Sequence, residues 1–232
     1  MSPAARAVRQ GKAGTGPCDG SPRLPRAGCL VLASTVDAVL VADLHHFLDM
    51  PHDAPTPARR LAEQLSRIVR AATAGEPGVA WQSALACGRR PAHCACTGHI
   101  AVARFDVPAS IQWQCTACGD DGVITGWQQS RFDLRSHPGN PAPAHTDQVV
   151  ISAETAAALC TLVLLDPDSE RMVFSAHFTD NDIMLAGDED DFDELIGYVA
   201  AEANHEPNRR RRKQLDAAFK ELRAASRALT AR

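Results

Sequence analysis

The chain has 232 residues, which is enough for one sizeable domain or two small ones. Its 45% hydrophobic content can form a substantial core, although only 5% of the residues are aromatic. The formal net charge of −4 argues against a protein that coats nucleic acid with its whole surface. Eight cysteines are too few for a disulfide scaffold in a chain of this length.

The N-terminal segment, residues 1–40, is expected to be a disordered arm or an extension of the folded protein. Residues 1–28 are rich in Gly, Pro, Ala and Arg and show no periodicity. Residues 29–42 are apolar and predict a strand or a short helix. We find no pattern typical of a signal peptide or a membrane span, because polar residues interrupt the apolar stretch. We therefore expect a cytoplasmic protein with no membrane partner.

Residues 41–80 are expected to form a helical N-terminal segment. Thr56 is a good N-cap residue, and Pro57 suits the first helical position. Apolar side chains then recur at helical spacing, at Leu61, Leu65, Ile68 and Val69. The pattern predicts an amphipathic helix over 57–73, ended by Gly75.

Residues 81–134 carry two cysteine clusters separated by alternating segments. The first cluster holds Cys87, Cys94 and Cys96, and the second holds Cys115 and Cys118. Strands are predicted over 100–105, 111–115 and 123–127, with turns at Val107-Pro108 and Asp120-Asp121-Gly122. Two cysteine knuckles joined by a β-meander predict a central zinc-ribbon-like architecture.

The second cluster reads Cys-Thr-Ala-Cys-Gly, in which the glycine allows a tight turn after the last ligand. Zinc takes four ligands, for which five cysteines and two histidines, His93 and His99, compete. Neighbours i and i+2 of an extended chain point to opposite sides, so we expect only one of Cys94 and Cys96 to bind. Our hypothesis is a Zn²⁺ site formed by Cys87, Cys96, Cys115 and Cys118, with Cys94 or His93 in place of Cys87 as the chief alternative.

Other interpretations of the cysteines remain open at this point. They could be free thiols, or Cys115 and Cys118 could form a redox pair, although a turn rather than a helix follows them. A catalytic zinc ion would need an open position and a general base, for which Asp120 and Asp121 are candidates. Since four sulfur ligands leave no open position, we favour a structural ion and expect that the protein is not an enzyme.

Residues 148–232 predict a small α+β unit that ends in two helices. Strands are expected at 148–151 and 161–165, and a hairpin is expected from 171–178 and 182–186. Helices are expected at 153–160 after Ser152, from the acidic run at 188–194 to 204, and at 208–229 after Pro207. The predicted fold class of the whole chain is α+β.

Three further groups could have a functional role. A cluster of carboxylates and imidazoles could bind a second metal or support an enzyme, and it comprises Asp43, His45, His46, Asp49, His52 and Asp53. Glu202 and His205 share a helix face but are more typical of a helix end. The cationic run from Arg209 to Lys213 could bind nucleic-acid phosphates or pair with the acidic run at 188–194. Trp81, Trp113 and Trp127 are expected to pack the ribbon rather than stack bases.

The chain resembles a family of uncharacterised bacterial proteins from high-GC Gram-positive genomes. The resemblance is carried by the Asp43-Leu-His-His-Phe-Leu-Asp segment, the Pro57-Ala-Arg-Arg-Leu-Ala-Glu segment, and the sequence around Cys115-x-x-Cys118-Gly119-Asp120 and Phe132-Asp133-Leu134. It implies no particular reaction. It supports the ligand set Cys87, Cys96, Cys115 and Cys118, because similar proteins lack a cysteine at the position of Cys94.

The sequence therefore predicts a zinc-binding interaction or regulatory module whose partner is a protein or a nucleic acid. The alternatives are a nucleic-acid-binding protein that uses the ribbon and the run from Arg209 to Lys213, and an enzyme that uses the cluster from Asp43 to Asp53.

Overall fold

A computed structural model describes residues 39–51, 53–136, 147–180 and 182–230. It has 45% helix and 25% strand, which confirms the predicted α+β class. Eight strands form one sheet in the order β1-β5-β4-β3-β2-β7-β8-β6. The N-terminal part of the described chain forms five of these strands, and residues after 146 form the other three.

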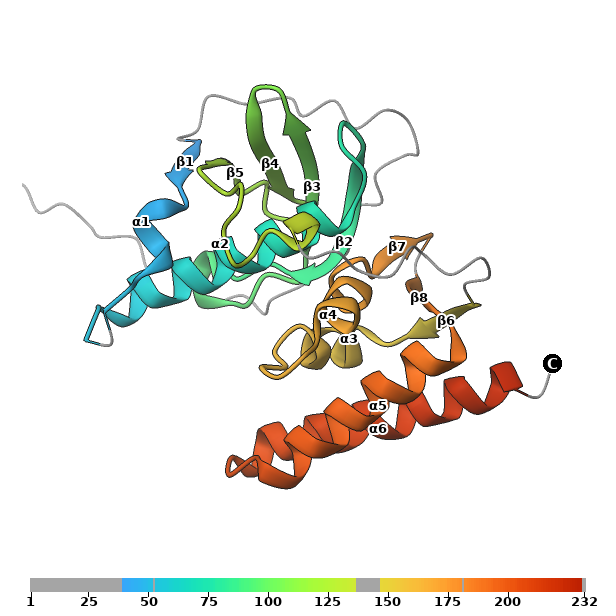
Figure 1. Ribbon diagram of the computed structural model, residues 1–232. Helices are drawn as coiled ribbons and strands as arrows, with labels where there is room; N and C mark the ends of the chain where they lie inside the picture. Colours follow the sequence, from blue (N-terminus) through green and yellow to red (C-terminus); the bar gives the residue numbers. More distant parts are fainter. Residues whose placement is uncertain (1–38, 52, 137–146, 181, 231–232) are drawn as a thin grey trace, which may run out of the picture.

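The first half of the sheet is a meander with one parallel edge strand (Figure 1). Its antiparallel strands are β2 (Ala80–Ala86), β3 (His99–Asp106), β4 (Ala109–Cys115) and β5 (Asp121–Thr125). β1 (Leu40–Asp43) pairs in parallel with β5. The end of the segment 29–42, for which a strand or a short helix was predicted, is therefore a strand. Residues 29–38 of that segment lie outside the described residues. The three strands predicted over 100–105, 111–115 and 123–127 are therefore confirmed, with β5 ending at Thr125.

Helix α2 (Thr56–Ala74) lies along β2, β3 and β4 and closes the core of this half. Leu65, Ile68 and Val69 are fully buried, as their helical spacing predicts. The expectation that Thr56 is the N-cap is wrong by one residue. The carbonyl oxygen of Pro55 accepts hydrogen bonds from Ala58 and Arg59, so helical bonding already begins at Pro55 and Thr56 is helical. A short helix α1 (His45–Leu48) follows β1.

The second half adds β6 (Asp147–Ile151), β7 (His177–Thr179) and β8 (Asp182–Gly187). β7 and β8 form a hairpin at the predicted turn, although β7 covers only the end of the strand predicted at 171–178. Ser152 caps α3 (Ala153–Leu159) as expected. β2 pairs with β7 at Ser83 and His177, and Ala84 donates a backbone hydrogen bond to Ala176. One sheet therefore spans both predicted segments, while their division into domains stays a prediction.

The connection between α3 and β7 differs from the expectation. Residues 161–165 form turns and bends instead of a strand, and α4 (Pro167–Phe174) replaces most of the predicted strand at 171–178. The reason is the Asp166-Pro167 pair: the Asp166 carboxylate accepts hydrogen bonds from the N–H groups of Asp168 and Ser169, and proline suits the first helical position. Met172, Val173 and Phe174 are buried on this helix.

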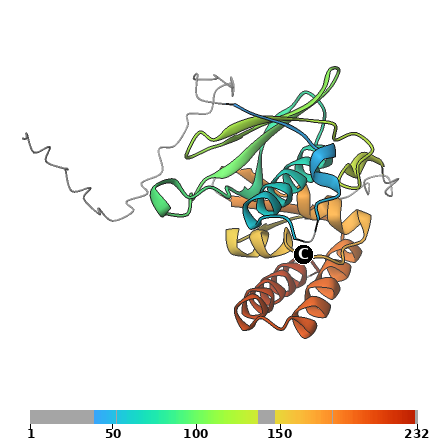
Figure 2. The same ribbon diagram turned by 90° about the vertical axis from the view of Figure 1, so that its left-hand side faces the viewer.

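Two long helices, α5 (Glu189–His205) and α6 (Arg209–Thr230), end the described chain. They lie side by side in both Figure 1 and Figure 2, away from β3 and β4. Asp188 and Asp191 form a reciprocal capping box at the start of α5, consistent with the predicted acidic start. No helix within the described residues combines the length and apolarity needed to cross a membrane.

Candidate metal centre

Four cysteines from two separate connections meet at one end of the sheet. Cys87 directly follows β2, and Cys96 lies in the loop before β3. Cys115 is the last residue of β4, and Cys118 lies in the turn between β4 and β5. Ile111, Trp113 and Cys115 alternate along β4 and are all buried, so the period of the strand turns Cys115 towards the core.

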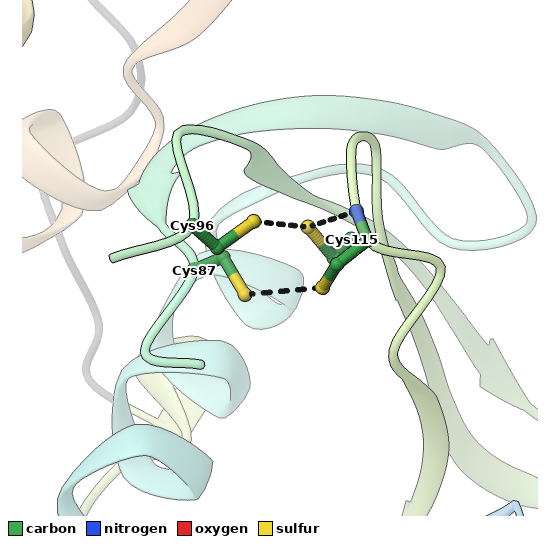
Figure 3. A group of neighbouring side chains, drawn as sticks. Cys87, Cys96 and Cys115 are labelled. Carbon is green, nitrogen blue, oxygen red and sulfur yellow. Dashed lines mark hydrogen bonds between the residues drawn. The ribbon is translucent and has the colours of Figure 1, made fainter. Parts of the chain in front are cut away.

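The sulfur atoms are spaced as the ligands of one tetrahedral ion. The four Sγ atoms all lie within 4.8 Å of one another. Cys96 Sγ is 3.7 Å from Cys115 Sγ, and Cys87 Sγ is 3.8 Å from Cys118 Sγ. Figure 3 shows Cys87 and Cys96 facing Cys115 across the gap between the two connections. Sulfur atoms bound to zinc at about 2.3 Å in a tetrahedron lie about 3.8 Å apart, so these side chains fit the ion.

Backbone N–H groups surround the sulfur atoms in a repeated pattern. The residue two positions after each cysteine directs its N–H towards the sulfur: Arg89 towards Cys87, Gly98 towards Cys96, and Ala117 towards Cys115, at 3.4–3.5 Å. The N–H of Asp120 acts in the same way on Cys118. Such donors stabilise negative charge on sulfur, so both connections are shaped for thiolates.

The two connections have the tight turns that the sequence predicts. Gly119 has φ +72°, a conformation that a side chain would strain. Gly98 lies against the opposite connection, and a Cβ atom there would be 2.7 Å from Cys115 Sγ and 2.6 Å from Ala117 Cβ. Glycine is therefore required at position 98 by close packing.

Burial and hydrogen bonds shift the pKa values of the cysteine thiols. It raises the pKa of the Cys118 thiol to about 11 and that of Cys87 further. Burial also acts to raise the pKa of Cys96, but the N–H of Gly98 and the neighbouring thiols lower it below its usual value. A bound divalent ion would displace the protons and balance the charge of the thiolates.

The alternative ligands Cys94 and His93 are not part of the four-cysteine cluster. Both residues belong to a loop whose two ends are joined by a hydrogen bond from the N–H of Cys96 to the carbonyl oxygen of Arg89. His93 is exposed with φ +68° in a short 3₁₀ helix, Pro91–His93. The structure thus brings together the four cysteines of the first hypothesis, while their binding of an ion stays a prediction.

Asp120 is the candidate general base nearest to the four cysteines in sequence, two residues after Cys118. Its carboxylate instead lies 3.4 Å from the guanidinium of Arg89. Burial raises the pKa of Asp120, and Arg89 opposes that shift. The ion pair of Arg89 and Asp120 joins the β2–β3 connection to the β4–β5 connection beside the four cysteines. The sequence did not predict this contact.

The carboxylate and imidazole cluster from Asp43 to Asp53 does not form a metal-binding group among the described residues, and His52 lies outside them. Asp43 accepts hydrogen bonds from the backbone N–H of His45 at 3.0 Å and is 2.9 Å from its Nδ1. The backbone N–H of His45 lowers the pKa of Asp43, and the ring adds to the effect. This contact shapes the turn between β1 and α1.

The cationic run is divided between internal contacts and solvent. Arg211 pairs with Glu202 and Glu206, and Arg212 donates to the carbonyl oxygen of Glu206. The proposed pairing with the acidic run at 188–194 is wrong, because α5 and α6 run antiparallel and place the two runs at opposite ends. Arg209, Arg210 and Lys213 are exposed.

Glu202 is likewise used in packing. It pairs with Arg211 and accepts a hydrogen bond from the N–H of Val163 at 3.0 Å, while His205 is exposed. Trp113 and Trp127 are buried, as expected of packing residues, and Trp81 is half-buried beside His177.

Sequence reasoning missed a buried ion pair next to this half of the core. Asp133 is fully buried and receives two hydrogen bonds of 2.9 Å from Arg135, whose guanidinium lies over the ring of Trp127 at 4.4 Å. The signal was present as an aspartate between two apolar residues, Phe132 and Leu134, but its partner depends on the fold.

Comparisons of the chain with protein-family models, with curated proteins and with solved structures found no match. The resemblance noted from the sequence therefore stays a prediction.

Proposed function

We propose that the protein is a cytoplasmic zinc-binding interaction or regulatory module whose metal centre is structural. The observation that carries this proposal is the spacing of the four sulfur atoms, 3.7 Å and 3.8 Å in the two closest pairs, which suits one tetrahedral ion. Thiolate ligands favour zinc over hard cations such as magnesium or calcium. The resemblance to a bacterial family, which implies no reaction, is consistent with this proposal.

The ligand set supports a structural role rather than a catalytic one. Four cysteines complete a tetrahedral shell, so a bound ion would keep no position for water or substrate. The nearby carboxylate of Asp120 is engaged with Arg89. The ion would instead join the β2–β3 connection to the β4–β5 connection.

A module of this kind presents a surface rather than a reaction centre. A metal ion bound by Cys87 and Cys96 would hold both ends of the loop at 89–95. The side chains of Arg89 and Arg90 are exposed on this loop. We propose that a protein or nucleic-acid partner recognises surfaces held in this way. Asp43 and His45 contact each other and lie against Gly126, and they belong to no metal-binding group among the described residues.

The test is the metal content of the protein purified without added metal, measured by elemental mass spectrometry. We expect about one zinc ion per chain in the wild type and its loss in Cys115→Ser. Cys160→Ser is the matched control, because Cys160 follows α3 and is not part of the four-cysteine cluster. Circular dichroism of each variant separates loss of the ion from loss of the fold.

A stable wild-type fold with no metal, and with thiols that react freely, would contradict the proposal. Equal zinc content in Cys115→Ser and Cys160→Ser would contradict the ligand set. Replacement by cobalt adds a direct readout, since its visible absorption reports tetrahedral thiolate ligation, which should disappear in Cys115→Ser only.

A further inference from the structure

A second candidate site is a polar pocket that is separate from the metal centre. The pocket has a volume of about 700 Å³ and lies between α2, the loop after α3 and the start of α6. Three guanidinium groups line it, those of Arg67, Arg70 and Arg211. We call it the arginine pocket. Its volume is in the range of small-molecule sites, and none of the four cysteines of the metal centre lines it.

Two of the three arginines are held by the fold. Arg70 forms an ion pair with Glu170, and its guanidinium lies 4.6 Å from the ring centre of Phe132 and 5.5 Å from that of Phe174. Arg211 pairs with Glu202 and donates a hydrogen bond of 2.8 Å to the carbonyl oxygen of Thr161. Both guanidinium groups are thus positioned before any ligand binds, which lowers the entropy cost of binding.

Arg67 is different, because no carboxylate lies within 4.0 Å of it among the residues that the structure describes. Glu63 precedes it by one helical turn and also lines the pocket, yet the two do not form an ion pair. Arg67 is half-buried. Burial lowers the pKa of Arg70, Glu170 opposes this, and the charge of Arg67 lowers it further. Two like charges therefore face one cavity, and no counterion of Arg67 lies among the described residues.

An anion with several oxygen atoms is the ligand that this arrangement suits. Guanidinium groups bind phosphate oxygens in a bidentate manner, and their donors lie in a fixed plane. Leu162, Val163 and Leu165 form an apolar wall beside the arginines, where the uncharged part of a ligand could lie. The carboxylates of Glu63 and Glu170 also line the pocket and disfavour a long polyanion.

We propose that the arginine pocket binds the phosphate group of a small phosphorylated molecule, with Arg67 as the residue whose charge the phosphate neutralises. Arg70, on the same helix as Arg67, and Arg211, on α6, supply further donors. The proposal does not depend on the metal centre, and the two can fail separately.

The test measures binding of inorganic phosphate, and then of a sugar monophosphate, to the full metal-loaded chain by calorimetry. Chloride at equal ionic strength is the reference. Arg67→Gln removes the unpaired charge, and the loss of charged hydrogen bonds predicts an affinity for phosphate lower by about tenfold or more. Arg60→Gln is the matched control, because Arg60 lies two turns earlier on α2 and does not line the arginine pocket. Arg60 and Arg67 both line a neighbouring pocket, so a loss of binding in both variants would place the phosphate there instead.

We expect Arg60→Gln to bind phosphate as the wild type does. Equal losses in the two variants, or no binding beyond that of chloride, would overturn the proposal. A single-stranded oligonucleotide that binds more tightly than the sugar phosphate would overturn the assignment to a small molecule and favour nucleic acid. Unchanged circular dichroism and zinc content in Arg67→Gln exclude an indirect effect through the fold.

Discussion

Gly98 and Cys115 approach each other so closely that a Cβ atom at position 98 would lie 2.7 Å from Cys115 Sγ. The two residues belong to different connections of the sheet, so their contact sets the distance between the two pairs of cysteines. Gly98 also donates its N–H to Cys96 Sγ at 3.4 Å. Gly98 therefore contacts a cysteine of each connection, Cys96 through its N–H and Cys115 through close packing.

We predict that Gly98→Ala weakens zinc binding by about tenfold or more, because groups that orient metal ligands affect affinity on this scale. Competition with a chromogenic chelator measures the change. Gly197→Ala is the control, since a Cβ atom at this position of α5 meets nothing within 4 Å. There the substitution should leave zinc affinity unchanged and stabilise the helix by up to about 1 kcal/mol. An unchanged affinity in Gly98→Ala would show that the two connections move apart freely.

Removal of the ion should loosen one end of the sheet and leave the other intact. Two backbone bonds near the cluster depend on its geometry, Cys87 N–H to Gly98 O at 2.8 Å and Cys115 N–H to Asp120 O at 2.7 Å. With a strong chelator, we expect hydrogen exchange to accelerate at these amides, while the pairing of β6 with β8 keeps its protection. Uniform acceleration over both regions would mean that the ion stabilises the whole fold.

The buried carboxylate of Asp133 predicts a pH dependence of stability. Burial acts to raise its pKa, but the hydrogen bonds from Arg135 and from the N–H of Gln129 outweigh burial and hold the pKa below the ordinary value of 3.8. A carboxylate with a lowered pKa stabilises the native state above the unfolded value, and this contribution is lost as the pH falls below 3.8 towards the folded value.

We therefore predict that Asp133→Asn lowers the free energy of unfolding by about 2 kcal/mol at pH 7, because charged hydrogen bonds to the buried carboxylate are lost while Arg135 keeps its contact with Asp106. The difference from the wild type should shrink as the pH falls below 4, as measured by denaturant unfolding of both proteins at each pH. Asp168→Asn is the control, since Asp168 forms an exposed i,i+3 pair with Arg171 and should matter by less than about 1 kcal/mol. A constant difference over the whole pH range would contradict the argument.

Glu221 of α6 joins the last helix to the cap of α3. Its carboxylate accepts hydrogen bonds from Ser152 N–H at 2.5 Å, Ser152 Oγ at 2.8 Å and Thr155 Oγ1 at 2.5 Å. Burial acts to raise the pKa of Glu221, but these donors lower it overall. We predict that Glu221→Gln costs about 2 kcal/mol in thermal or chemical unfolding, because charged hydrogen bonds are lost. Asp216→Asn, an exposed change on the same helix, should have little effect.

Local patterns in the sequence were sufficient for most elements of the fold. The spacing of Leu65, Ile68 and Val69 predicted α2, and alternation along 111–115 predicted β4. The strand predicted at 171–178 is mostly wrong, since Met172, Val173 and Phe174 are buried on a helix. A short apolar run suits a strand and a buried helix equally, and the cap formed by Asp166 decided between them.

The sequence by itself determined the cysteine knuckle at Cys115 and Cys118 and the four-cysteine hypothesis, since spacing along the chain limits which side chains can converge. Only the tertiary structure decided that Cys87 rather than Cys94 stands opposite Cys118, because this depends on where a loop returns. It also decided the pairing of β2 with β7 and the meeting of Arg67, Arg70 and Arg211 around one pocket. Contacts between residues far apart in the chain arise from packing, and no local periodicity encodes them.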